Sequence, residues 1–151
     1  MRYVSGNSIT LLKNGTDFFP ALEAAVDAAR HEVHLETYIF ADDNAGQRIA
    51  NALRRAAERK VVVRVVVDGF GSQNFFPPEM VDVMLKSGVE LFIYRPEAFR
   101  FSFRRHRLRR MHRKIAMIDG MTAFIGGINI IDDINTPHHT PPRYDYAVKF
   151  M

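Results

Sequence analysis

The pair His112 and Lys114, two residues apart, is the first candidate for chemistry in this sequence. Alternate residues of a strand project from the same face, so the two side chains should meet. A neutral imidazole can attack phosphorus and form a covalent intermediate, and a neighbouring ammonium stabilises charge on the phosphoryl oxygens. The pair therefore predicts phosphoryl-transfer chemistry.

Four positions downstream extend this prediction. Gly126 and Gly127 would let the backbone approach a ligand with its N–H groups free, and the Asn129 amide would add a donor. The glycines also fit a bulge, and Asn129 also fits a turn. Asp119 precedes a glycine, so a hairpin turn explains it as well as chemistry does. Together the set predicts a phosphate cradle with a nucleophile in it.

The positive charge of the chain is concentrated just before this pair. Residues 100–114 hold seven arginines, one lysine and two histidines without a carboxylate, within a net charge of +4. Such density implies an anionic partner, with phosphate on lipid or nucleic acid as the candidates. Aromatic residues between the arginines suit a lipid headgroup boundary. The expected lipid contacts are Phe101, Phe103, Arg104, Arg105, Arg107, Arg109 and Arg110.

The composition fits one globular domain, residues 1–151, with 47% hydrophobic and 25% charged residues. The absence of cysteine excludes disulfides and thiolate metal sites. No run of residues has the apolar length of a signal core or a membrane span. No His, Asp or Glu cluster has metal-ligand spacing, and the pair His138 and His139 fits a solvated loop, so we expect neither metal nor cofactor.

Strands and helices alternate in the first part of the chain. The patterns predict strands over 9–12, 32–40, 61–68 and 89–94. They predict helices from Thr16 or Asp17 to about 29, from 43 to 60, and from 77 to 87. The nearly continuous apolar run at 61–68 indicates a parallel strand covered on both faces. We therefore predict an α/β fold with a mixed, mostly parallel sheet flanked by helices.

The rhythm changes after Tyr94. A basic connection over 95–111 has the length of a functional loop. Residues 112–118 and 122–125 then predict a hairpin that turns at Asp119-Gly120, and a last strand follows in YDYAVKF. Because the chain stops on a strand, we expect a piece of a larger protein.

The spacing His112-x-Lys114-x4-Asp119-x6-Gly126-Gly127-x-Asn129 resembles the HKD motif of the phospholipase D superfamily, with every motif position filled. The resemblance extends over nearly the whole chain, through LETYIF, VVDGFGS, RRMHRKIAMIDG, FIGGIN and YDYAV. Within the superfamily the chain is most similar to the first catalytic half of bacterial B-type cardiolipin synthases.

The resemblance implies roles for single residues. His112 would be the nucleophile or its general acid partner, and Lys114 and Asn129 would bind phosphate beside the glycine backbone. Asp145 stands where family members carry an acid that orients the histidine, which agrees with the physical benefit of fixing a tautomer. Asp119 completes the motif. Glu36 matches a recurrent family position and fits an arginine pair equally well. The family needs no metal.

Family catalysis uses two HKD motifs, and here only His112 has a lysine at the second following position. The second motif must come from a missing C-terminal half or from a twin subunit in a homodimer. We favour the missing half, so the chain would be one half of a two-fold pseudosymmetric enzyme.

The resemblance implies a phosphatidyltransferase that acts through a phosphohistidine. Its partners would be anionic phospholipids (phosphatidylglycerol and cardiolipin) at a membrane surface. The protein would be bound peripherally to the cytoplasmic side of a bacterial membrane. The alternative is a single-motif endonuclease or phosphodiesterase that acts as a homodimer, although we do not expect nucleic acid as partner. A second alternative is a lipid-binding module without catalysis.

Overall fold

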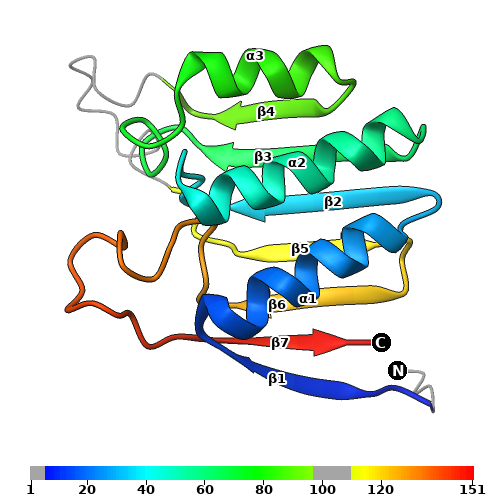
Figure 1. Cartoon of the computed structure of the whole chain (residues 1–151), viewed down its shortest axis with the longest axis horizontal. Coiled ribbons are helices and arrows are strands. Elements are labelled where there is room, and N and C mark those ends of the chain that lie inside the picture. Colours follow the sequence, from blue (N-terminus) through cyan, green and yellow to red (C-terminus); the bar gives the residue numbers. More distant parts are fainter. Residues whose placement is uncertain (1–5, 97–109) are drawn as a thin grey trace.

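The computed structural model describes residues 6–96 and 110–151 of the chain, and all its strands join one sheet (Figure 1). The sheet has seven strands in the order β1-β7-β6-β5-β2-β3-β4. The strands are β1 (Ile9–Lys13), β2 (Glu32–Thr37), β3 (Val62–Asp68), β4 (Glu90–Tyr94), β5 (Ile115–Ile118), β6 (Thr122–Gly126) and β7 (Tyr146–Phe150). The predicted α/β class and the predicted hairpin β5–β6 are confirmed.

The balance of strand directions differs from the prediction. Only β2–β3 and β3–β4 pair in parallel, whereas β1–β7, β7–β6, β6–β5 and β5–β2 are antiparallel. The sheet is therefore mixed but not mostly parallel. The alternation of strand and helix extends only to β4, and β5, β6 and β7 then join the sheet through a return of the chain and a hairpin, which impose antiparallel pairing.

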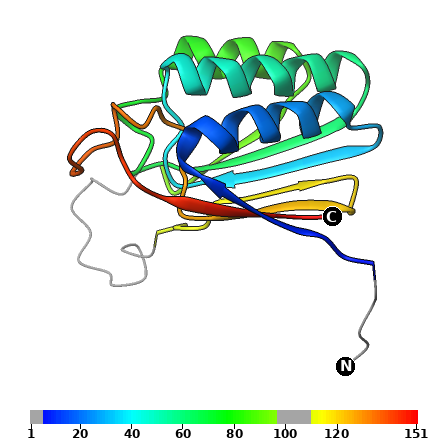
Figure 2. The same ribbon diagram turned by 60° about the horizontal axis from the view of Figure 1, so that its bottom comes forward.

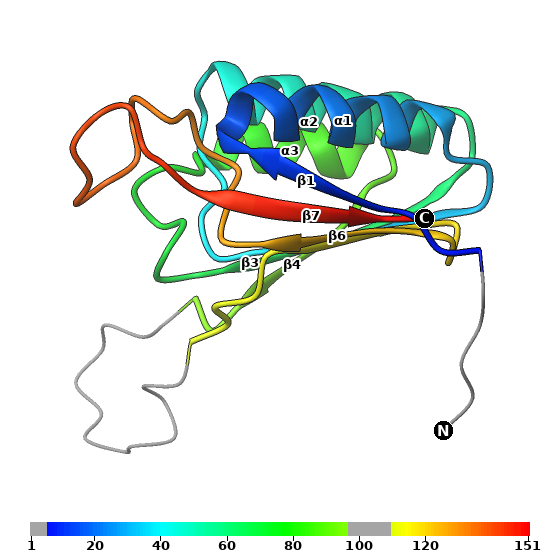
Figure 3. The ribbon, with the colours of Figure 1, turned by 90° about the horizontal axis from the view of Figure 1, so that it is seen from below.

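The described residues form three helices, which lie on one face of the sheet (Figures 2 and 3). They are α1 (Asn14–Ala28), α2 (Asn44–Glu58) and α3 (Pro78–Lys86). On β2 every second residue (Val33, Leu35 and Thr37) is buried, which is the alternation expected of a strand covered on one side. The prediction that β3 is covered on both faces is wrong for the described residues, because burial alternates along the strand and Val62 is 39% exposed.

Helix starts follow local chemistry. Helix α2 starts where predicted, and Asp43 is its N-cap, since its carboxylate accepts a hydrogen bond from the Gly46 N–H at 3.0 Å. Helix α1 begins earlier than predicted, at Asn14, and the Asp17 carboxylate reaches back to accept from the Lys13 N–H. Among the described residues, no helix has the length and apolarity needed to cross a bilayer.

One end of the sheet gathers the loops that matter for chemistry. We call it the carboxyl edge: the end at which β2 and β3 finish (Thr37 and Asp68) and β5 and β7 start (Ile115 and Tyr146). In Figure 1 it lies on the left, where the connections after β2, β3 and β6 also emerge. Ligands of open α/β sheets commonly bind at such an edge.

Candidate active site

His112 and Lys114 meet at the carboxyl edge, just before β5. The Lys114 ammonium lies 2.9 Å from Nδ1 and 3.1 Å from Nε2 of His112, and it donates to the His112 carbonyl at 3.1 Å. Lys114 is 9% exposed, whereas the His112 side chain is exposed. The predicted pair therefore presents a reachable imidazole held against a buried cation.

Tyr38, just after β2, completes the surroundings of this pair. Its ring lies 4.8 Å from the His112 ring between centroids, at an interplanar angle of 50°. The Lys114 ammonium stands over the same ring, 5.4 Å from its centroid, within the range of a cation–π contact. The aromatic ring thus holds both members of the pair from one side.

The surroundings favour a neutral histidine. Loss of hydration lowers the pKa of His112, the Lys114 charge lowers it further, and the Asp68 carboxylate opposes both effects. Burial also lowers the pKa of Lys114, which the Asp145 charge opposes and the Arg143 charge reinforces. Only a neutral imidazole has a lone pair for attack, so these shifts suit a nucleophile.

Asp68, the last residue of β3, joins the segment after β3 to the segment before His112 through hydrogen bonds. Sequence analysis did not predict this role. The fully buried Asp68 carboxylate accepts from the N–H groups of Phe70 at 3.0 Å and Gly71 at 3.1 Å, and from Met111 N–H at 2.8 Å. Met111 directly precedes His112. The carboxylate therefore fixes the backbone that carries the histidine and places a negative charge near its ring.

The glycine pair serves packing rather than ligand binding through free N–H groups. The Gly126 N–H donates to the Lys114 carbonyl at 3.3 Å, and the Gly127 N–H donates to the Tyr146 carbonyl at 3.0 Å. The prediction of free donors is therefore wrong, because sheet pairing uses both. A Cβ atom at Gly126 would lie 2.4 Å from the Tyr146 carbonyl oxygen, and at Gly127 2.2 Å from Oδ1 of Asp145. Glycine lets β7 and Asp145 come this close to the site.

Asn129 and Asp145 also lie at this edge. The Asn129 side-chain oxygen accepts from the Ile39 N–H at 3.1 Å, which orients the amide and leaves its nitrogen as a donor. Asp145 accepts from its neighbour, the Tyr146 N–H, at 2.8 Å, and its charge acts on Lys114. Between the described groups of Asp145 and His112 no hydrogen bond is formed, so the orienting role of Asp145 stays a prediction.

Asp119 lies at the opposite end of β5 and not in the site. Its carboxylate accepts from the N–H groups of Arg30 at 2.9 Å, His31 at 2.8 Å and Glu32 at 2.9 Å, where β2 begins. The seven-residue step from His112 spans roughly 20 Å at about 3.3 Å per residue of strand. The prediction of a catalytic Asp119 is therefore wrong. Its backbone φ of 52° and the following Gly120 fit the hairpin turn.

The other predicted site residues lie outside the contact between His112 and Lys114. Glu36 pairs with Arg113, whose Nε lies 2.6 Å from the carboxylate, so the arginine-pair interpretation fits. Arg110 stands 4.6 Å over the Phe70 ring centroid. The other expected lipid contacts (Phe101, Phe103, Arg104, Arg105, Arg107 and Arg109) lie outside the described residues. His138 and His139 are exposed.

Sequence comparison agrees with the chemistry of this edge. Residues 22–136 match the family described as "Cardiolipin synthase, PLD-like domain". Cardiolipin synthase B of Shigella flexneri is 39% identical over 144 residues, which are 95% of this chain and 35% of that protein. The chain thus spans about a third of the length of this curated relative.

Two solved structures share the fold. NucT from Helicobacter pylori superimposes with a TM-score of 0.69 at 18% identity, over 96% of this chain and 86% of that one. Nuc from Salmonella typhimurium, a phospholipase D family member, gives 0.66 at 19% identity, over 96% and 83%. At such identities the likeness concerns the fold alone.

Proposed function

Because this chain belongs to the family of phospholipase D-like domains of cardiolipin synthases, we propose that it is one catalytic half of a phosphatidyltransferase. In this proposal His112 receives a phosphatidyl group from a phospholipid such as phosphatidylglycerol and passes it to an alcohol. The second half comes from another phospholipase D-like domain, in the same protein or in a twin subunit.

One observation carries the proposal: the exposed imidazole of His112 in contact with the buried ammonium of Lys114. Lysine beside a nucleophile neutralises negative charge on the phosphoryl oxygens as the bond to histidine forms. The Asn129 amide nitrogen adds a neutral donor. Loss of hydration and the Lys114 charge lower the pKa of His112, which favours the neutral, attacking form.

The proposed transfer has two steps, formation and breakdown of a phosphohistidine. A ring nitrogen of His112 bonds to phosphorus while the bond from phosphorus to the headgroup oxygen breaks, and an acid of the second half protonates the departing alcohol. An acceptor hydroxyl then attacks phosphorus, loses its proton to the same group, and the bond between phosphorus and His112 breaks. The product is a new phosphodiester, and both catalytic groups return to their starting forms.

The anionic lipid would be held at the membrane surface by the basic segment before His112, of which Arg110 is described. We place the enzyme peripherally on the cytoplasmic side of a bacterial membrane. The nuclease alternative has less support, since the relatives with 32 to 39% identity are named as cardiolipin synthases.

The test uses the native full-length protein on phosphatidylglycerol vesicles, with a His112→Ala variant beside it and lipid products resolved by mass. We expect cardiolipin and free glycerol from the parent protein only. Lipid products from both proteins would exclude His112 as the reacting group. Consumption of single-stranded DNA but not of lipid would establish the nuclease instead.

A further inference from the structure

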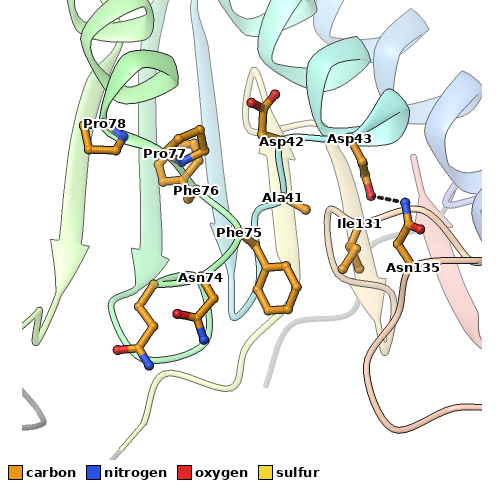
Figure 4. Close-up of a pocket in the computed structure, with 11 residues that line it drawn as sticks. Ala41, Asp42, Asp43, Asn74, Phe75, Phe76, Pro77, Pro78, Ile131 and Asn135 are labelled. Atoms are coloured by element: carbon orange, nitrogen blue, oxygen red, sulfur yellow. Dashed lines mark hydrogen bonds between the residues drawn. The ribbon is translucent and has the colours of Figure 1, made fainter.

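A groove of about 640 Å³ opens at the carboxyl edge, between the segment after β2 and the segment after β3 (Figure 4). Its size falls within the range of small-molecule sites. Ala41, Asp42 and Asp43 form one wall, the run from Gln73 to Pro78 forms the other, and Ile131 and Asn135 close the third side.

The groove lies beside the catalytic pair. Ala41 follows Tyr38 by three residues and Ile131 follows Asn129 by two, so the first wall and the third side start within about 10 Å of Tyr38 and Asn129 along the backbone. Tyr38 and the groove residue Phe75 pack on the same small apolar cluster, which Ile39, Ala41 and Ile131 form. Because Tyr38 also contacts the His112 ring, this cluster links the groove to the catalytic pair.

Hydrogen bonds hold the groove in shape. Asp43 uses both carboxylate oxygens, for the Gly46 N–H at 3.0 Å and for the Asp132 N–H at 2.8 Å. The Asn135 side chain also donates to Asp43, at 3.3 Å. The Asp42 N–H donates to the Phe75 carbonyl at 2.7 Å and joins two of the walls. The frame is therefore fixed before any ligand enters.

Two lining side chains remain available for a ligand. Gln73 and Asn74 are exposed, and among the described residues neither side-chain amide has a hydrogen-bond partner. An amide offers both donors and an acceptor, which matches a hydroxyl group, itself donor and acceptor. Asp42 adds a carboxylate, one oxygen of which accepts from the Gln47 side chain while the other can accept from a hydroxyl group.

The charge of the groove argues against phosphate as its ligand. No lysine or arginine of the described residues lines it, whereas Asp42 and Asp43 do. The two sides of the edge thus differ in charge: a cation beside His112 for the phosphoryl group, and amides with carboxylates next to it. Apolar surface from the half-buried Phe75 can cover the carbon side of a small polyol.

We propose that this groove binds the acceptor alcohol of the transfer, as an uncharged polyhydroxyl group of glycerol size or its equivalent in a lipid headgroup. The inference rests on the proposed function. Gln73 and Asn74 hold hydroxyl groups of the acceptor and direct one toward the phosphorus on His112. That hydroxyl oxygen bonds to phosphorus, its proton passes to the acid–base group of the second half, and His112 is released. Water performs the same step when the groove is empty, and hydrolysis results.

The experiment measures how the intermediate divides between alcohol and water. The native full-length protein acts on phosphatidylglycerol vesicles in deuterated glycerol, and mass spectrometry compares labelled phosphatidylglycerol with phosphatidic acid. The test variant is Gln73→Leu with Asn74→Leu, which keeps volume and removes the amides. The control is Asn51→Leu, an exposed amide on α2 outside this groove.

We expect the ratio of transfer to hydrolysis to fall about tenfold in the double variant, the effect of two lost hydrogen bonds, and to stay unchanged in the control. Total consumption of phosphatidylglycerol should stay near that of the parent. An unchanged ratio in the double variant would overturn the groove as acceptor site while leaving the transferase intact. Absence of lipid consumption by the parent would overturn the proposed function, and the groove assignment with it.

Discussion

Residues of one sequence motif lie at the two ends of β5 and have different surroundings there. Before the strand, His112 and Lys114 contact each other and the Tyr38 ring, and the Asp68 charge acts on His112. After it, Asp119 accepts three backbone hydrogen bonds where β2 begins. The first end has an exposed imidazole and a buried cation, whereas the second has a satisfied carboxylate in a turn.

The difference shows that a fixed spacing in sequence need not mean one site in space. A strand of four residues separates the two ends, so residues at either end cannot contact the same phosphoryl group. The Asp119 carboxylate accepts from the N–H group of Glu32 at the start of β2. Tyr38 lies just after the other end of β2, where it contacts His112. Variants at the two ends should therefore separate chemistry from stability.

His112→Ala should have the largest effect, on chemistry alone. Removal of a nucleophile typically costs about 10⁴-fold or more in turnover. The side chain is exposed, so the melting temperature should stay within about 2 °C of the parent. Product analysis on phosphatidylglycerol vesicles and a thermal scan check both. Turnover within tenfold of the parent would remove His112 from the mechanism.

Lys114→Met should reduce turnover by about 10² to 10³-fold, the usual loss for one charge-stabilising donor. It should also raise the pKa of His112, because the Lys114 charge now lowers it. The acid limb of the rate profile should therefore move to higher pH, since attack needs the neutral ring. A limb that does not move would show that the two groups are not coupled in the full-length protein.

Asp119→Asn should act on the fold, with a loss of about 1 to 3 kcal/mol in the free energy of unfolding, typical for weakened bonds to a charged acceptor. Burial alone would raise the pKa of Asp119, but the three N–H bonds outweigh it and the net pKa is lowered. A lowered folded-state pKa means that the ionised group stabilises the fold above the unfolded value and loses this effect as pH falls through the folded value.

Denaturant titrations at several pH values check this sign. The difference between parent and Asp119→Asn should be full at pH 7 and should shrink below about pH 4, the ordinary range of aspartate. A difference that grows toward acid pH would contradict the assignment of an ionised, hydrogen-bonded carboxylate.

Asp68→Asn should give the smallest shift in pH dependence and should affect the catalytic end. The Asp68 charge raises the pKa of His112, so its removal should lower that pKa and move the acid limb to lower pH. The direction is opposite to that expected for Lys114→Met. Histidine NMR titration of the folded variant separates this electrostatic effect from a displaced backbone, which would change rate without this shift.

Local patterns in the sequence predict most elements but not their assembly. The turn at Asp119-Gly120 and the helix start at Asp43-Asn44 depend on adjacent residues, and the structure confirms both. The antiparallel pairing of β5 with β2 depends on the path of the chain after β4, which no local pattern encodes.

The site divides in the same way. The spacing of His112 and Lys114 predicts their contact, which the structure confirms. The predicted strand over 112–118 is too long at its start, because both residues precede β5, which begins at Ile115. The Asp68 carboxylate accepts from the Met111 N–H across 43 residues, and Tyr38 contacts His112 from the segment just after β2. Such contacts arise from the order of the strands in the sheet. The one sequence signal for Asp68 is its place in VVDGFGS, a segment that carries the family resemblance. Sheet register likewise decides that the N–H groups of the glycine pair are occupied.

Turnover of Asp119→Asn tests most directly whether the motif is divided between two ends of β5. The full-length variant would be assayed on phosphatidylglycerol vesicles, about 15 °C below its own melting midpoint. We predict turnover within about twofold of the parent, because a group on a remote turn does not touch the reacting atoms. A loss as large as that of Lys114→Met, in a protein that remains folded, would contradict the account and return Asp119 to the site.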